Sequence, residues 1–321
     1  MIALTAALLV FGISPAQAQV TRYLTGNGAD VDPLLSGPVF DLGGGGADVA
    51  SAFQALIDGT RGCTDCDATV DVVVLRTSGA DGYNDFVAAM AGVDSVETLV
   101  VTRAGDASKV VDTVRDAEVV FFAGGDQCTY TTVFGGAVRD AVKSVVARGG
   151  GVGGTSAGMA IQAHYAYDGC VGSVASAAAL ANPYDSSVTF TTDHFHWPVL
   201  SGVVTDTHFV ARDRMGRLMV FLSRQLADGR TDLAIGLAAD EASSLFIDRN
   251  GRATVMGTGD SYVVVADGPP EVCQPRKPLT HRGFKVWRLS PGDTFDLSDR
   301  PTEGFHSIDV VNGVLSADPY R

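Results

Sequence analysis

The chain has 321 residues, of which 46% are hydrophobic and 19% are charged. This composition is that of a globular protein, and the length allows a large buried core. The formal net charge of −14 is accompanied by no block of basic residues, so the sequence argues against nucleic-acid binding.

The first 18 residues predict a signal peptide. The apolar run within them is short for a membrane span, and Ala16-Gln17-Ala18 is typical of a signal-peptidase site. Because no basic residue precedes the run, a buried N-terminal helix is the alternative. No later apolar stretch reaches transmembrane length. We therefore expect an exported protein, periplasmic or extracellular, with no membrane span and with residues 19–321 as its mature part.

From about residue 37, predicted strands alternate with predicted helices. Short β-branched runs predict strands at 38–42, 70–75, 96–102, 117–123 and 233–239. Apolar residues at helical spacing predict helices at 49–57, 86–90, 133–148 and 214–227. This alternation indicates an α/β fold, with a mostly parallel sheet covered by helices on both faces.

The last part of the chain has a different pattern. From about residue 243 the signals alternate between strand and turn, with strands at 244–247, 253–256 and 262–266. These signals predict antiparallel hairpins that extend the sheet. Because no linker or repeat interrupts the chain, we expect residues 19–321 to form a single α/β domain with a β-rich C-terminal extension.

The segment Gly154-Thr-Ser156-Ala-Gly158 lies between a predicted strand and a helical stretch. A serine on such a tight turn has an exposed hydroxyl, and the following helix offers free backbone N–H groups beside it. The flanking glycines permit the backbone conformation that the turn needs. The pattern is typical of a serine nucleophile with an oxyanion site. The alternative is a glycine-rich turn whose serine only caps the helix.

A run of four glycines, Gly43–Gly46, also joins a predicted strand to a predicted helix. This position would suit a phosphate-binding loop. The run lacks the GxGxxG spacing and the Lys-Ser/Thr pair of such loops, so a tight turn is the better interpretation.

Three further motifs follow predicted strands, whose carboxyl ends meet at the edge of a parallel sheet where ligands bind. The first is Gly124-Gly-Asp126-Gln127, in which the glycines expose N–H groups and the two polar side chains could contact a substrate. The second places His208 at a strand–helix junction, and the third places Glu241 after the strand at 233–239. For the Gly124-Gly-Asp126-Gln127 motif, the alternative is a plain turn.

These motifs give the order Ser156, His208, Glu241. An α/β-hydrolase would instead have serine, then a carboxylate, then histidine. His281 and His306 come late enough in the chain to satisfy that order, but neither ends a clear core strand. The sequence therefore favours His208 as the partner of Ser156.

The chain has five cysteines, and Cys63 and Cys66 form a Cys-x-x-Cys pair. Such a pair could be half of a zinc site or a redox motif, but no second pair at zinc-finger spacing accompanies it. In an exported protein a local disulfide is the favoured interpretation. The odd number leaves at least one cysteine without a partner in the chain.

Taken together, four motifs resemble the cyanophycinase and aspartyl-dipeptidase family of serine peptidases. They are Gly-Gly-Asp-Gln, Gly-Thr-Ser-Ala-Gly, Asp-x-His-Phe-x-x-Arg-x-Arg-x-Gly-Arg-Leu and Asp-Glu-Ala, and they occur in the family's order over about residues 38–247. The Asp-Glu pair resembles the cyanophycinase branch. The resemblance implies a flavodoxin-like fold, related to the class I glutamine amidotransferases, which have cysteine where this family has serine.

The resemblance also implies a role for each matching residue. Ser156 would be the nucleophile, His208 its general base and Glu241 the residue that orients the histidine. The other residues that the resemblance implies would contact the substrate. Backbone N–H groups of Gly124, Gly125 and Ala157 would be oxyanion donors, and the side chains of Asp126, Gln127 and Arg212 would bind the substrate. No metal or organic cofactor is implied. The alternative role for Arg212 is an ion pair with a neighbouring acid such as Asp206.

One departure from the family is a long insertion between Ser156 and His208. It contains Asp193-His-Phe-His196, a near-copy of the histidine motif, which would offer another base or a metal-binding pair. His208 is favoured because only it is followed by Arg-x-Arg-x-Gly-Arg-Leu.

The expected function is that of an exported serine exopeptidase acting on cyanophycin or related β-aspartyl peptides. Cyanophycinases cut an aspartate backbone decorated with arginine and release β-aspartyl-arginine. The alternatives are an α-aspartyl or isoaspartyl dipeptidase with the same machinery, and an inactive binding protein of the same fold. The expected partner is a peptide, and the sequence is compatible with a homodimer.

Overall fold

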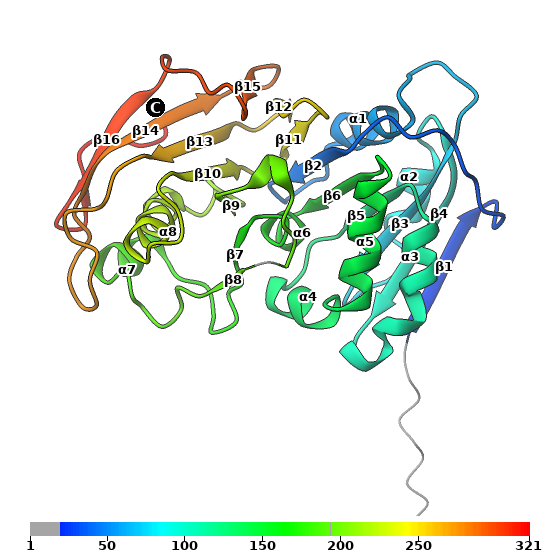
Figure 1. The fold of residues 1–321 in the computed structure, drawn as a ribbon, viewed down its shortest axis with the longest axis horizontal. Helices are drawn as coiled ribbons and strands as arrows, with labels where there is room; N and C mark the ends of the chain where they lie inside the picture. The colour runs from blue at the N-terminus through cyan, green and yellow to red at the C-terminus, as the bar shows by residue number, and fades with distance from the viewer. Residues whose placement is uncertain (1–19, 193) are drawn as a thin grey trace, which may run out of the picture.

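The computed structural model describes residues 20–192 and 194–321, which form two large sheets lying side by side (Figure 1). The predicted signal peptide lies outside the described residues, and so does Asp193. Within the described ranges, no helix is both long enough and apolar enough to cross a membrane.

The first sheet has nine strands in the order β1-β4-β3-β5-β6-β2-β11-β12-β15. The five strands from β4 to β2 are parallel, and the outer strands on both sides pair antiparallel. The strands are β1 (Val20–Gly26), β2 (Val39–Gly43), β3 (Val70–Arg76), β4 (Val93–Val101), β5 (Val119–Phe122), β6 (Gly151–Thr155), β11 (Ser243–Ile247), β12 (Arg252–Gly257) and β15 (Thr294–Asp296).

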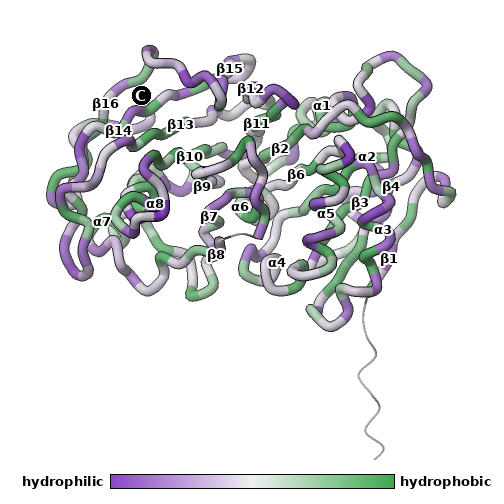
Figure 2. Tube along the Cα trace, viewed as in Figure 1, coloured by the Kyte–Doolittle hydropathy of each residue, from purple (hydrophilic) through white to green (hydrophobic). Residues whose placement is uncertain are grey.

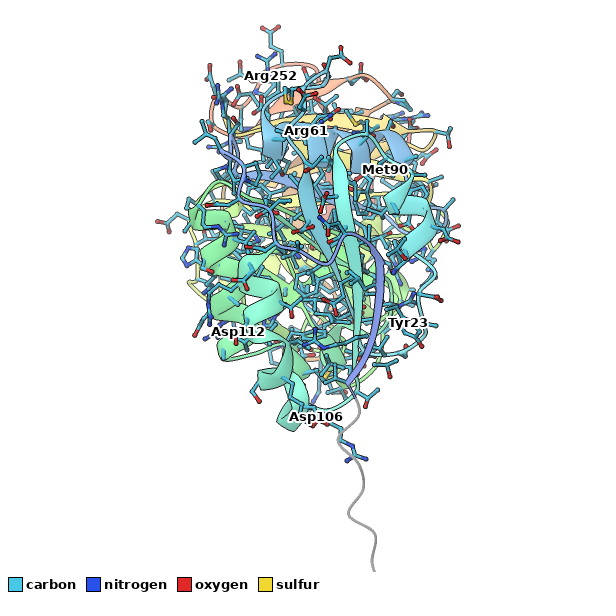
Figure 3. The ribbon with its side chains drawn as sticks, turned by 90° about the vertical axis from the view of Figure 1, so that its right-hand side faces the viewer. Tyr23, Arg61, Met90, Asp106, Asp112 and Arg252 are labelled. Carbon is cyan, nitrogen blue, oxygen red and sulfur yellow. A yellow bond between two sulfur atoms is a disulfide. The ribbon has the colours of Figure 1, made fainter. Side chains whose placement is uncertain are left out.

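Helices cover both faces of the parallel strands, as the alternation of side chains along each strand requires. Val72 and Val74 pack in a cluster with residues of α1 and α2, whereas Val73 and Leu75 pack with residues of α3 and α5. Figure 3 looks onto the edge of this sheet and shows α2 and α3 on opposite sides of it. The helices of this part are α1 (Ala50–Arg61), α2 (Asn84–Ala88), the 3₁₀ helix η1 (Ala104–Val110), α3 (Val111–Asp116), α4 (Gln127–Val133), α5 (Ala137–Ala147) and α6 (Ala157–Ala160).

The predicted helix at 133–148 corresponds to α5, which begins at Ala137 rather than at residue 133, and the helix before it, α4, was not predicted. Helix α4 ends at Val133 and α5 begins at Ala137, with Gly135 and Gly136 between them. Gly136 has a φ of 57°, a conformation that interrupts a right-handed helix and that glycine adopts readily. The break leaves α4 as a separate short helix directly after the Gly-Gly-Asp-Gln motif.

The second sheet has six strands in the order β17-β16-β14-β13-β10-β9, and only β9 and β10 pair parallel within it. Its strands are β9 (Val203–Asp206), β10 (Ala234–Ala239), β13 (Ser261–Ala266), β14 (His281–Leu289), β16 (His306–Val311) and β17 (Val314–Leu315). Helices α7 (Ser176–Ala181) and α8 (Met215–Ala227) lie beside it (Figure 1). The small pair β7 (Tyr165–Tyr167) and β8 (Phe190–Thr192), and the 3₁₀ helix η2 (Pro198–Leu200), complete the described elements.

This second sheet corrects the prediction that the C-terminal hairpins simply extend the first sheet. Strands β11, β12 and β15 do extend it, but β13 pairs with β10, and β14 and β16 follow β13 in the second sheet. Both faces of the second sheet are apolar, so it needs cover on both sides. Val204 and Val264 pack in a cluster with residues of α8, while Val203 and Val263 join the cluster that also contains Leu245 of β11. Apolar strand residues accordingly occupy the interior of both sheets in Figure 2.

Two disulfides lie in this frame. Cys63 is bonded to Cys66, as the sequence predicts, in the loop after α1. Cys128 of α4 is bonded to Cys170 in the loop after β7, a link that the sequence analysis did not identify. Cys273 is a free thiol.

We expect the two disulfides to differ in their contribution to stability. In the loop-entropy model, a bond that closes a longer loop restricts the unfolded chain more. The Cys128–Cys170 bond, which spans 42 residues, should contribute about 4 kcal/mol, and the Cys63–Cys66 bond, which spans 3, about 2 kcal/mol. The Cys128→Ala/Cys170→Ala protein should therefore lose more free energy of unfolding than the Cys63→Ala/Cys66→Ala protein. Denaturant unfolding of the oxidised proteins measures both losses, and equal losses would contradict the loop-length argument.

Candidate active site

Ser156 follows β6 directly and is the N-cap residue of α6. Its φ of 54° is in the left-handed region, which is uncommon for a residue other than glycine. No hydrogen bond from its side chain caps the helix, so the helix-cap alternative does not describe it. Instead, its Oγ lies 2.9 Å from Nε2 of His208.

His208 and Glu241 complete a chain of three side chains. Nδ1 of His208 lies 2.6 Å from Oε1 of Glu241. A carboxylate at Nδ1 fixes the proton on that nitrogen, which leaves Nε2 of a neutral imidazole free to accept the Ser156 hydroxyl proton. The residues come from the ends of β6, β9 and β10, and the last two end side by side because they pair parallel.

The environment keeps His208 neutral and Glu241 ionised. His208 is 8% exposed, and burial lowers its pKa below the ordinary value; the hydrogen bond with Glu241 opposes this shift by raising the pKa. The same hydrogen bond lowers the pKa of Glu241, whose side chain is 44% exposed. A neutral imidazole beside a serine hydroxyl can act as a general base near neutral pH.

The glycine run at 43–46 holds the three segments together. Backbone carbonyls of Gly43, Gly44 and Gly45 accept N–H bonds from Ser156 (2.9 Å), His208 (2.8 Å) and Ala242 (2.9 Å) respectively. A Cβ at Gly45 would lie 2.5 Å from the His208 ring, and one at Gly44 would lie 2.1 Å from a backbone oxygen of Asp240. The run is therefore a turn, as predicted, but its glycines are required by close contact with the candidate catalytic residues.

The arginines that follow His208 have separate positions. Arg217 is buried and donates two hydrogen bonds to the carboxylate of Asp206, at the end of β9. Arg214 donates to the backbone oxygen of Thr207 at 2.7 Å. Both contacts hold the chain immediately before His208. Arg212 is exposed, and its side chain has no hydrogen-bond or ion-pair partner within residues 20–192 and 194–321. Asp206 pairs with Arg217 and Arg214 instead, so the predicted alternative of an Arg212–Asp206 pair is not observed.

Asp240, which precedes Glu241, holds the chain after His208. Its Oδ1 accepts backbone N–H bonds from Val210 and Ala211, both at 3.0 Å. The loop that carries the histidine is thus fixed from its far side by the loop that carries Glu241. Asp240 belongs to the Asp-Glu-Ala motif, but the motif alone did not predict these contacts.

The implied oxyanion donors lie close to Ser156. A Cβ at Gly124 would be 3.8 Å from Cβ of Ser156, and Ala157 is the first residue of α6, where helix N–H groups lack intrahelical acceptors. Gly125 lies further along the same turn, with the Tyr130 ring 3.4 Å from where its Cβ would be. Gly124 and Ala157 therefore have the better position for an oxyanion formed at the serine.

Two of the implied substrate residues already have structural contacts. Oδ1 of Asp126 accepts the backbone N–H of Thr129 at 2.7 Å and caps α4. Nε2 of Gln127 makes a long contact of 3.5 Å with the backbone oxygen of Tyr167. Of the three, only Arg212 is both exposed and without a side-chain partner in the described part of the chain.

The other histidines lie elsewhere. His194 is 4% exposed, its ring packs against Phe195, and burial lowers its pKa to about 4. The ring of His196 stacks on that of His164 with centroids 4.2 Å apart. His281 and His306 lie in β14 and β16 and do not line the cavity around Ser156. Among the described residues, no group of three histidine, cysteine or acidic side chains is arranged to hold a metal ion.

A cavity of about 300 Å³ opens beside Ser156 and His208. Arg76, Tyr83 and Asp48 line it, and none of them was predicted from the sequence to belong to the site. Arg76 is the last residue of β3, so the rule that ligands bind at the carboxyl ends of parallel strands would have indicated it.

Comparisons with known proteins agree with the predicted family. No protein-family model matches the chain. The cyanophycinases of Nostoc sp. and Trichormus variabilis are each 28% identical to it over 218 residues, 65% of this chain and 67% of each relative. The crystal structure of a peptidase from an acI-B1 actinobacterium covers 82% of this chain and 98% of its own, with a TM-score of 0.55 and 16% identity, and so has a similar fold. The chain is a homologue of the cyanophycinases, a peptidase with a mostly parallel α/β fold.

Proposed function

We propose that the chain is an exported serine exopeptidase that hydrolyses cyanophycin or related β-aspartyl peptides. The proposed catalytic mechanism is supported by two hydrogen bonds, one between Ser156 Oγ and His208 Nε2 and one between His208 Nδ1 and Glu241. The substrate class is taken from the cyanophycinase homologues. Export is supported by the sequence of residues 1–18 and by the two disulfides, which are typical of oxidising compartments.

In this mechanism Ser156 Oγ attacks the carbonyl carbon of the scissile amide while His208 Nε2 takes the hydroxyl proton. Backbone N–H groups of Gly124 and Ala157 stabilise the oxyanion, with Gly125 as a further donor. His208 then gives its proton to the departing amine, and the acyl-enzyme remains. Water attacks the ester, again with His208 as base, and frees the serine. Glu241 holds the imidazole in its productive tautomer throughout.

The serine is tested directly by replacing it. Ser156→Ala should fold normally and lower kcat by a factor on the order of 10³ or more, because no other side chain can form the acyl-enzyme. Labelling with a serine-directed phosphonate should modify Ser156 in the native protein and nothing in the variant. A native protein that resists the phosphonate would be a binding protein of the same fold, and near-normal hydrolysis by folded Ser156→Ala would refute the mechanism.

The pH dependence tests the histidine. The neutral form of His208 is the base, and burial lowers its pKa below 6.5, so kcat/KM should be maximal above that pKa and decline as the pH falls through it. Glu241→Gln removes a hydrogen bond that raises this pKa. Its acid limb should therefore move to lower pH, while kcat falls about 10²- to 10⁴-fold because the tautomer is no longer fixed. An acid limb that moves upward would contradict the assignment.

Arg212 is proposed to bind an aspartyl carboxylate near the scissile bond, with Asp126 and Gln127 contacting other polar atoms of the substrate. An arginine can hold a carboxylate through two parallel hydrogen bonds, and lysine cannot reproduce this planar fork. We expect β-Asp-Arg peptides to be cleaved faster than matched α-Asp-Arg peptides, and Arg212→Lys to lower kcat/KM for the former about tenfold. Steady-state kinetics on the two peptides measures both effects, and equal rates on both linkages would argue instead for a general aspartyl dipeptidase.

A further inference from the structure

Arg76 is a second arginine at the candidate catalytic centre, on a different element from Arg212. It ends β3, and it lines the cavity of about 300 Å³ that also contains Ser156 and His208. It is half-buried, whereas Arg212 lies exposed in the loop after His208. A substrate whose scissile carbonyl reaches Ser156 would therefore have Arg76 among its neighbours.

The loop after β3 is built around this guanidinium. Nε of Arg76 donates to the backbone oxygen of Ser78 at 3.1 Å, and Nη1 donates to that of Ala80 at 3.0 Å. Gly79 has a φ of 90°, and a Cβ there would lie 2.5 Å from Nη2 of Arg76. The backbone thus follows the planar group closely, so the arginine is held in place before any ligand binds.

The charge of Arg76 remains without an ion-pair partner in the described part of the chain. Asp48, the acid among the residues that line the cavity, interacts with Arg76 through its charge, but no ion pair within 4.0 Å joins the two side chains. The guanidinium instead lies over the Tyr83 ring, 5.6 Å from its centroid. Such stacking orients the group but does not neutralise it.

Arg76 also has hydrogen-bonding capacity to spare. A guanidinium has five N–H donors, and the two bonds to Ser78 and Ala80 use two of them. The other donors belong to a positive, half-buried group beside a cavity. A carboxylate satisfies both the charge and the planar donor pair, which a neutral amide oxygen does not.

We propose that Arg76 forms a second carboxylate subsite, distinct from the one at Arg212, so that the preferred substrate carries two free carboxylates near the bond that is cut. The inference rests on the proposed peptidase function. A terminal β-aspartyl-arginine unit has the required chemistry, because it carries the free main-chain carboxylate of aspartate and that of arginine. Monocarboxylate peptides should be poorer substrates.

The test uses a model peptide ending in β-aspartyl-arginine in three forms, with both carboxylates free, with only the aspartate carboxylate amidated, and with only the arginine carboxylate amidated. Each amidation should lower kcat/KM of the native enzyme about 10- to 100-fold. Arg76→Met should abolish the penalty of amidating the arginine carboxylate and keep the penalty of amidating the aspartate carboxylate. Arg212→Lys should reduce the penalty of amidating the aspartate carboxylate. Arg103→Met, which removes an exposed arginine outside the cavity, is the matched control and should behave as the native enzyme.

Two results would overturn the inference: an Arg76→Met enzyme that loses kcat/KM equally on all three peptides, or the same penalty lost in both arginine variants. Thermal unfolding shows whether Arg76→Met retains its loop, and Arg76→Lys provides a variant that keeps the charge and should show a reduced penalty at the same carboxylate. Phosphonate labelling of native Ser156 separates this inference from the function itself. Failure to label would refute the peptidase mechanism and the subsite together, whereas labelling with no amidation penalty would refute the subsite alone.

Discussion

The candidate active site depends on three consecutive backbone carbonyls, those of Gly43, Gly44 and Gly45. They accept N–H bonds from Ser156, His208 and Ala242, and these are three of the six non-glycine residues with positive φ among those described. A left-handed conformation costs such residues on the order of 1–3 kcal/mol and persists only where the surroundings enforce it. One short turn therefore enforces the conformation at the serine, at the histidine and beside the glutamate. A Cβ at Gly44 would collide with the backbone oxygen of Asp240 and one at Gly45 with the His208 ring, so glycine is needed at these two positions.

This turn has to join two sheets. Ser156 follows the first sheet, whereas His208 and Glu241 follow the only parallel pair of the second. The apolar cluster shared by both sheets, which contains Leu42 of β2, Leu237 of β10 and Leu245 of β11, keeps the strand ends in register. Packing of large apolar side chains thus brings the strand ends that carry the nucleophile and the base close together. Hydrogen bonds to the carbonyls of the glycine run then fix the exact positions of Ser156 and His208.

The sequence predicted the α/β class, the parallel strands around Ser156 and the three side chains that meet there, because short β-branched runs and strand-end motifs are local signals. It did not predict the second sheet, because pairing between distant strands such as β10 and β13 leaves no local pattern. It also missed Asp240, Arg76 and the Cys128–Cys170 bond. Each of these interactions joins residues that are distant in sequence and meet only in the folded chain. Asp240 accepts the backbone N–H of Val210, about 30 positions away, and Arg76 lines a cavity formed by other strands.

Among the charged residues around His208, the buried ones stabilise the backbone that carries the histidine, and the more exposed ones are free to bind a substrate. Asp206 and Arg217 are 3% exposed each and satisfy one another, so they hold the strand end but have no capacity for a substrate. Arg212 and Arg76 have unused donors and lie at the surface and at the cavity. A buried charge is retained only with a partner, and one at an open site can instead exchange water for a ligand. One arginine-rich motif can therefore contain both an arginine that stabilises the position of a general base and an arginine that binds the substrate. The two roles are distinguished by whether each guanidinium already has a partner in the protein.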